Sequence, residues 1–87
     1  MEKTFSIFFR KSAEKQMLSL PKIIGFRIIE MIESLRKNPY PINSKRLTVH
    51  SNIYRLRMAD YRIIYRIEKN QLIIEIIKVG HRQNIYK

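Results

Sequence analysis

The chain has 87 residues, 45% of them hydrophobic, and carries 18 Lys and Arg against 7 Asp and Glu, for a formal net charge of +11. This size and content predict one domain over residues 1–87, and a sequence without cysteine or a long apolar run excludes a disulfide framework, a thiolate metal site and a membrane-spanning helix. So large a positive charge favours a polyanionic partner (nucleic acid, an acidic protein or an anionic membrane surface) over a basic protein with no such partner.

The first half of the chain predicts a strand followed by a helical hairpin. Residues 4–9 alternate between polar and apolar side chains, which is typical of a strand. Residues 12–37 carry apolar side chains at helical spacing, with Ser12 as the expected cap of a first helix and Pro21 as the first residue of a second. Gly25 costs that second helix about 1 kcal/mol relative to alanine, and we expect its small size to let the two helices approach closely.

The second half predicts a three-stranded antiparallel meander. Residues 53–58 and 61–67 each alternate cleanly, and Ala59 and Asp60 form the turn between them, although neither is the glycine that a two-residue hairpin prefers. Residues 72–79 are mostly β-branched and predict a third, central strand that is covered on both faces. The predicted fold is α+β, with the helical hairpin packed on one face of the sheet.

The predicted hairpin gathers arginines on one face. If Ala59–Asp60 closes a tight turn, Arg57 lies directly across from Arg62, with Arg55 and Arg66 close by on the same face; a three-residue loop would shift this register. Like charges directly opposite each other destabilise a sheet by roughly 0.2–1 kcal/mol, so folding alone has no use for the pair. Phosphate binding does, because guanidinium groups hold phosphate oxygens in pairs. The alternative is a basic solvent-exposed face whose arginine stems cover apolar surface.

The end of the third strand, Val79-Gly80-His81-Arg82, adds further candidates for a site. Histidine titrates near neutral pH, so His81 is either a general acid or base or a solvated turn residue. Tyr86 either stacks on a nucleobase or packs against the core. Two histidines and scattered carboxylates predict no metal site, and a glycine-rich phosphate loop is missing. A nuclease built from these residues would need no metal or cofactor: the RNA 2′-OH would be its nucleophile, with arginines stabilising the phosphorane charge.

These motifs together resemble the RelE/ParE toxin superfamily, and its RelE branch most of all. The resemblance is carried by Tyr54–Arg57, by the DYR-x-x-Y motif at Asp60–Tyr65 and by the VGHR-x-x-x-Y motif at Val79–Tyr86, and the predicted layout agrees over nearly the whole chain. It implies a toxin of a type II toxin–antitoxin system, namely a ribosome-dependent mRNA endonuclease. Such an enzyme cuts codons in the ribosomal A site and leaves a 2′,3′-cyclic phosphate.

The resemblance also implies roles for single residues. Arg62 matches the arginine that stabilises the transition-state phosphate, and Arg82 matches the arginine proposed as general acid or leaving-group stabiliser. Tyr86 matches the tyrosine that stacks on or orients the substrate.

One pair of positions departs from the family pattern. Arg55 and Arg57 stand where relatives of the RelE branch have two lysines, one of them proposed as general base. Arginine keeps its proton at any relevant pH, so we expect this pair to hold phosphate and His81 to transfer the proton. The expected RNA-binding set is completed by Lys45, Arg46 and Arg66.

The partners implied by the resemblance are a cognate acidic antitoxin that folds on binding, and the 70S ribosome with its mRNA. Operator DNA would be bound only through the antitoxin complex, and no membrane is involved, so the expected location is the bacterial or archaeal cytoplasm. Two alternatives stay open: a ParE-like inhibitor of DNA gyrase, and a catalytically weak relative that binds antitoxin and operator DNA. ParE-like members generally lack the full arginine–tyrosine set, whose presence here favours the RNA-cleaving toxin.

Overall fold

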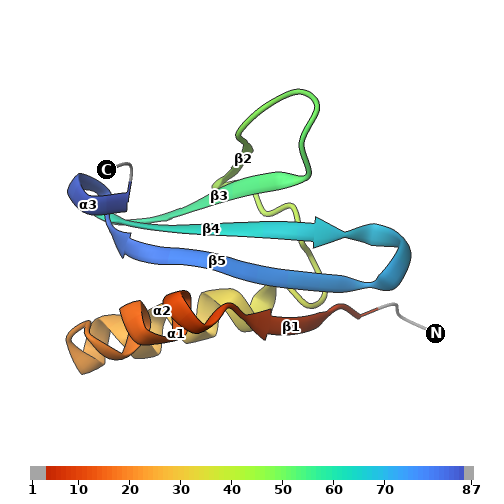
Figure 1. Cartoon of the computed structure of the whole chain (residues 1–87). Coiled ribbons are helices and arrows are strands. Elements are labelled where there is room, and N and C mark those ends of the chain that lie inside the picture. Colours follow the sequence, from red (N-terminus) through yellow and green to blue (C-terminus); the bar gives the residue numbers. More distant parts are fainter. Residues whose placement is uncertain (1–3, 86–87) are drawn as a thin grey trace.

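A computed structural model describes residues 4–85 of the chain, and the side chains of residues 4–83. In this part of the chain, two helices lie beneath one face of a five-stranded sheet, which confirms the predicted α+β class (Figure 1). The elements in chain order are β1 (Ser6–Phe9), α1 (Lys11–Leu18), α2 (Lys22–Ser34), β2 (Ser44–Arg46), β3 (Ile53–Met58), β4 (Tyr61–Glu68), the 3-10 turn η1 (Lys69–Gln71), β5 (Ile73–His81) and the one-turn helix α3 (Arg82–Ile85).

The sheet is mixed, with the strand order β1-β5-β4-β3-β2. The predicted antiparallel meander is confirmed for β3, β4 and β5, and β1 adds to its edge parallel to β5. At the other edge, β2 pairs antiparallel with β3 and was not predicted. Its three residues, Ser44-Lys45-Arg46, are all polar and carry no alternation, so their own sequence contains no strand signal.

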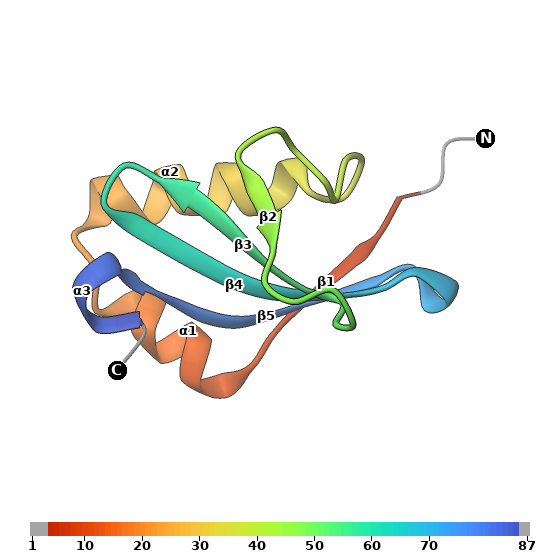
Figure 2. The same ribbon diagram turned by 90° about the horizontal axis from the view of Figure 1, so that it is seen from above.

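The two long helices cover the sheet because each has one apolar side. α1 buries Ala13 and Met17, and α2 buries Ile28 and Ile32, with Leu35 following directly after its last residue. Viewed from above (Figure 2), both helices lie beneath the strands, while α3 and the β3–β4 turn share one end of the sheet. The sheet residues that complete this core are Tyr54, Leu56, Ile63, Tyr65, Ile67, Ile74, Ile76 and Val79.

The beginnings of the helices differ from the prediction. The Arg10 N–H still bonds to Ile76 O of β5 (2.9 Å), while its carbonyl accepts the first helical bond from the Glu14 N–H (3.0 Å). α1 therefore starts directly at the sheet edge, and Ser12 lies inside its first turn instead of capping it. Pro21 is the N-cap of α2, one position before the expected one.

Gly25 does not serve the close helix packing that its small size suggested. A Cβ atom built on this residue meets no atom within 4 Å, and its φ is not positive. The expectation of a close approach between the helices at this point is therefore wrong. Glycine at this position only lowers the stability of α2.

β5 lies between β1 and β4, but only one of its faces is covered. Ile74 and Val79 are buried in the core, whereas Glu75 and Lys78 lie on the opposite face of the sheet, 24% exposed in the case of the Glu75 side chain. Pairing with β4 skips Ile77, and this irregularity returns Val79 to the core face. The expectation of a strand covered on both faces is wrong, because both long helices pack on the same side (Figure 1).

Candidate functional site

The sheet face opposite α1 and α2, which we call the open face, carries side chains in rows that run across the strands. The first row, nearest the β3–β4 turn, consists of Arg57, Arg62 and Gly80. The second row consists of Lys45, Arg55, Ile64 and Lys78. The third row consists of Ile53, Arg66, Glu75 and Phe8. Because strand residues alternate between faces, the register alone assigns these side chains to one surface.

Arg57 is the direct cross-strand partner of Arg62, which confirms the predicted register. The two-residue turn is possible without glycine because Ala59 adopts a left-handed conformation, with φ at 52°. Arg57 is exposed, whereas Arg62 is only 7% exposed. The Arg62 Nη1 atom donates hydrogen bonds to Ala59 O and Tyr61 O, both at 3.0 Å, so the turn holds this guanidinium in place.

Arg82 joins the same end of the sheet. Its backbone N–H donates to Asp60 O at 2.7 Å, and its Nε lies 3.8 Å from Asp60 Oδ1. Both side chains of this ion pair are more than half exposed, so the pair is weak and leaves the Arg82 guanidinium able to move to a ligand. Tyr86, the remaining candidate at this end, lies outside the described residues.

His81 is not brought to the arginines of the first row. It pairs with Tyr61, one position along from the Arg62–Gly80 pair, so alternation places it on the other face of the sheet. Its ring packs edge-on against the ring of Tyr61, with centroids 5.5 Å apart, and its Nδ1 accepts a hydrogen bond from the Gln83 N–H at 3.2 Å. The structure therefore separates His81 from Arg62, although the two are close in the sheet.

The two basic residues of β2 are divided between the faces of the sheet. Lys45 is exposed across from Arg55 and belongs to the second row. Arg46 lies on the opposite face, where its guanidinium donates to Tyr54 Oη (3.1 and 3.2 Å) and to Val49 O (3.2 Å). Arg46 thus ties the connection between β2 and β3 to the sheet instead of facing the first row.

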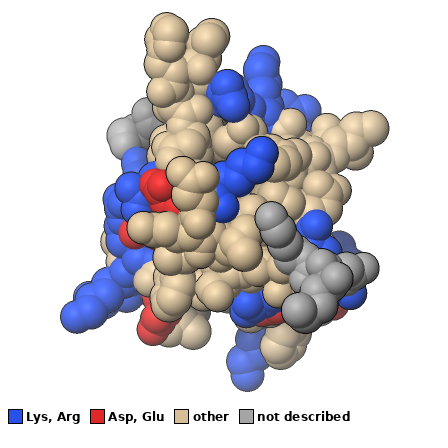
Figure 3. Space-filling model, turned by 90° about the vertical axis from the view of Figure 1, so that its right-hand side faces the viewer, with Lys and Arg blue, Asp and Glu red and all other residues tan. Residues whose placement is uncertain are grey.

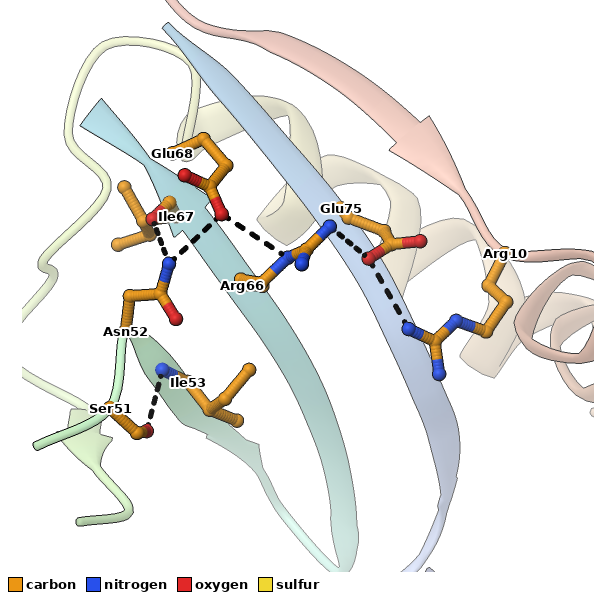
Figure 4. Close-up of polar contacts among 8 residues, drawn as sticks. All are labelled: Arg10, Ser51, Asn52, Ile53, Arg66, Ile67, Glu68 and Glu75. Carbon is orange, nitrogen blue, oxygen red and sulfur yellow. Dashed lines mark hydrogen bonds and ion pairs between the residues drawn. The ribbon is translucent and has the colours of Figure 1, made fainter. Parts of the chain in front are cut away.

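Arg66, in the third row, has two acidic neighbours. Its Nη2 lies 2.9 Å from Glu75 Oε1 and its Nε lies 3.6 Å from Glu68 Oε1 (Figure 4). The charge of Arg66 is thereby balanced by carboxylates of the protein, unlike the charges of Arg57 and Arg62 in the first row. Seen from the end of the sheet that carries the β4–β5 connection (Figure 3), Lys and Arg side chains lie on several sides of the molecule, so total charge alone does not mark the site.

An apolar groove of about 350 Å³ lies on the helix side of the molecule. Its lining residues are Phe9, Glu14, Met17, Leu18, Ile29, Ile32 and Glu33. Leu18 and Ile29 are 78% and 44% exposed, so the groove presents apolar surface to solvent. Among residues 4–85 no cluster of three His, Asp or Glu residues could hold a metal ion, and no helix in that range is long and apolar enough to cross a bilayer.

Comparisons with known proteins identify the family of the chain. A family model, the ParE toxin of type II toxin–antitoxin systems (parDE), matches residues 7–86. RelE1 of Methanocaldococcus jannaschii is 31% identical over 86 residues, which is 95% of this chain and 96% of that protein. The chain belongs to the RelE/ParE toxin superfamily. It is therefore similar to the toxins of type II toxin–antitoxin systems over nearly its whole length.

Solved structures of RelE/ParE toxins share the fold described above. The RelE–RelB complex from Pyrococcus horikoshii OT3 matches with a TM-score of 0.82 and 29% identity, covering 93% of this chain and 98% of that one. The RelBE2 complex of Mycobacterium tuberculosis matches with a TM-score of 0.81 over 97% of this chain and 98% of that one; at 23% identity it supports the fold alone. The predicted RelE-like fold is confirmed.

Two functional features of this RelE/ParE toxin were missed in the sequence. Glu75 reaches Arg66 from the neighbouring strand, which only the β4–β5 register reveals, and Glu68 reaches it from two residues further along β4. Gly80 leaves the position beside Arg62 without a side chain, and its φ is not positive, so backbone strain is not the reason for glycine there. Alternation within β5 was the available signal for Gly80, since it stands one residue before His81 on the opposite face.

Proposed function

We propose that this toxin is a metal-independent RNA endonuclease that cleaves mRNA in the A site of the ribosome. The observation that carries the proposal is the direct pairing of Arg57 with Arg62, at a cost to the fold, on a face that a ligand can approach. Two guanidinium groups side by side match the oxygens of one phosphate and stabilise charge that develops on them.

The reaction requires a nucleophile that the substrate itself supplies. The 2′-oxygen of the ribose attacks the neighbouring phosphorus and the bond from phosphorus to the 5′-oxygen breaks, which gives a 2′,3′-cyclic phosphate and a 5′-hydroxyl. The proton of the 2′-OH ends on the 5′-oxygen. Arg62 is buried and held by two carbonyls, so it is preorganised for the charge on the phosphorane oxygens, and Arg57 adds a second, exposed donor.

Further residues complete the proposed site. Arg82 stabilises the leaving oxygen from its position beside the turn, and Tyr86 orients the substrate. Arg55 and Lys45 bind the RNA backbone from the second row. His81 has no place in this reaction, because it lies with Tyr61 on the other face of the sheet.

A protein antitoxin is the second partner in the proposal. The RelE protein of Pyrococcus horikoshii is solved as a complex with RelB. This toxin would bind an acidic antitoxin in the same way, with an apolar helix of the partner in the groove beside Met17 and Leu18. Operator DNA would be bound only through that complex. The +11 charge makes the association rate fall as salt is added, which stopped-flow mixing measures.

Inhibition of DNA gyrase is the alternative function, because the family model that matches residues 7–86 carries the ParE name. The two functions are separated by adding purified toxin to a cell-free translation reaction. Cleavage of mRNA within codons, leaving 2′,3′-cyclic phosphate ends, is expected. Intact mRNA would contradict the proposal, and gyrase-linked DNA breaks with translation unaffected would establish the alternative.

Substitution of Arg62 tests the role of the first row directly. Removal of one preorganised donor to a developing oxyanion typically costs about 100- to 1,000-fold in rate, so Arg62→Ala should lose most of the cleavage. Arg27→Ala, which removes an exposed arginine from α2 on the far side of the sheet, is the matched control and should keep it. Equal cleavage activity in the two variants would show that Arg62 has no part in the reaction.

A further inference from the structure

We propose that single-stranded RNA binds across only one half of the open face, the half formed by the first and second rows. The other half is closed to phosphate by a chain of ion pairs, which we call the ion-pair chain and which runs through Glu68, Arg66, Glu75 and Arg10. The inference rests on the proposed function in one respect, namely that the ligand is RNA.

The charges of the two halves differ sharply. The first and second rows contain five cations and, among the described residues, no acid; the cations are Lys45, Arg55, Arg57, Arg62 and Lys78. The ion-pair chain contains two arginines and two glutamates, so its formal charge is +2 − 2 = 0. A polyanion laid on the open face therefore meets only basic charged side chains in the first two rows, whereas the charges of the ion-pair chain cancel one another.

The ion-pair chain is continuous and short-ranged (Figure 4). One oxygen of Glu75, Oε1, lies 2.9 Å from Arg66 Nη2 and 3.3 Å from Arg10 Nη2. The Glu75 side chain is 24% exposed, the least of the four, so its pairs are the least screened by solvent. Glu75 thus neutralises arginines on either side of it, one from β4 and one that directly follows β1.

The far end of the ion-pair chain is fixed by the backbone. Asn52 Nδ2 donates to Glu68 Oε1 at 3.1 Å and also to Ile67 O at 2.9 Å. The same Glu68 oxygen lies 3.6 Å from Arg66 Nε. A phosphate that approached Arg66 would have to displace two carboxylates, one of them held in place by Asn52, so Arg66 adds little to RNA binding.

This arrangement also sets the direction of the bound strand. The cations of the first two rows lie side by side across β2, β3, β4 and β5, so a backbone that follows them runs across the strands and not along them. Gly80 keeps the position beside Arg62 clear, and a side chain there would stand on the open face next to the reacting phosphate. The predicted footprint is short, because it ends where the third row begins.

The test is the salt dependence of binding to a 2′-O-methyl RNA oligonucleotide, which lacks the 2′-OH nucleophile and is not cleaved. For single strands the slope of log K against log salt changes by about 0.7 for each phosphate contact. Glu75→Gln should release Arg66 and Arg10 and steepen the slope by about 0.7–1.4, with tighter binding at low salt. Glu33→Gln is the matched control: it also removes one negative charge, together with the ion pair to Arg36 (2.6 Å), but on α2.

Two further variants keep the inference falsifiable if Glu75→Gln folds poorly. Arg66→Gln should leave the wild-type slope unchanged, because its charge is already balanced, whereas Lys45→Gln should make the slope shallower by about 0.7. Equal slopes for Glu75→Gln and Glu33→Gln, or a shallower slope for Arg66→Gln, would overturn the divided face and leave the proposed function standing. No binding of RNA by the wild-type toxin at low salt would overturn the inference, whereas the proposed function is overturned only by intact mRNA in the translation reaction.

Discussion

Arg57 and Arg62 stand directly opposite each other across the β3–β4 hairpin, one exposed and the other almost fully buried. Two like charges in this position oppose folding, and the turn compensates only Arg62, through the carbonyls of Ala59 and Tyr61. The pair therefore lowers the stability of the fold while it favours phosphate binding. A single substitution can separate these two effects.

Arg57→Gln should make the protein more stable and less active. Removal of the like-charge pair is worth roughly 0.2–1 kcal/mol in the free energy of unfolding, and the gain should shrink as salt screens the charges. The same change should slow mRNA cleavage, because one of two phosphate donors is lost. Urea denaturation at low and high salt, beside a cleavage assay, measures both effects. A less stable variant would show that the guanidinium of Arg57 contributes more to the fold than its repulsion costs.

His81→Gln should cleave mRNA at nearly the wild-type rate and with the same pH dependence. The side chain lies on the face that carries Tyr61, away from the first row, and glutamine can still accept the hydrogen bond from the Gln83 N–H. Rates measured from pH 6 to pH 8, beside those of Arg62→Ala, decide the point. Loss of the pH dependence in His81→Gln alone would show that the histidine transfers a proton in the reaction.

Gly25→Ala should raise the free energy of unfolding by up to about 1 kcal/mol. The added methyl group meets no atom within 4 Å, and alanine restricts the unfolded chain more than glycine does. For a domain of this size 1 kcal/mol corresponds to roughly 4–8 °C in Tm, which calorimetry resolves. Cleavage should be unchanged, since α2 lies on the other side of the sheet, and a drop in Tm would reveal a contact that the glycine makes possible.

Tyr65→Phe should remove an alkaline loss of stability. The Tyr65 hydroxyl donates to Pro39 O at 2.8 Å in the core, and burial raises the pKa of Tyr65 from 10.0 to about 12. In the unfolded chain the phenol ionises first, so its contribution to stability is complete below pH 10 and is lost as pH rises toward 12.

The comparison of the two proteins isolates this residue from the lysines and other tyrosines that titrate nearby. At neutral pH the phenylalanine variant should be less stable by about 1–3 kcal/mol, because the Pro39 carbonyl loses its partner. Between pH 10 and pH 12 that gap should close. Parallel stability curves over this range, from urea denaturation at each pH, would contradict the assignment.

The β3–β4 hairpin was predictable because two independent signals agree on it. Alternation in residues 53–58 and 61–67 excludes every register shifted by an odd number of residues, because such a shift would expose Tyr54, Leu56, Ile63 and Tyr65. A two-residue turn then selects the observed register among those that remain. The depth of Arg62 was not predictable, because alternation assigns a side chain to a face and not to a degree of burial.

Other features depend on chain segments that are distant in the sequence. β2 is defined by its pairing with β3, since its own residues are all polar. Strict alternation through β5 would place Glu75 on the same face as Val79, in the core; the skipped residue at Ile77 turns Glu75 to the open face, where it meets Arg66. The divided charge of that face therefore depends on one irregularity in strand pairing.

The parallel pairing of β1 with β5 also determines when the sheet can be completed during synthesis of the chain. Ser6 of the first strand lies beside Ile73 of the last, so β1 has no strand partner within the described sheet until the C-terminal part of the chain has been made. Contacts this distant in sequence form late and slowly. The hairpin that carries Arg57 and Arg62 also emerges after the helices, so a nascent chain cannot join these arginines to a complete sheet until β5 has left the ribosome.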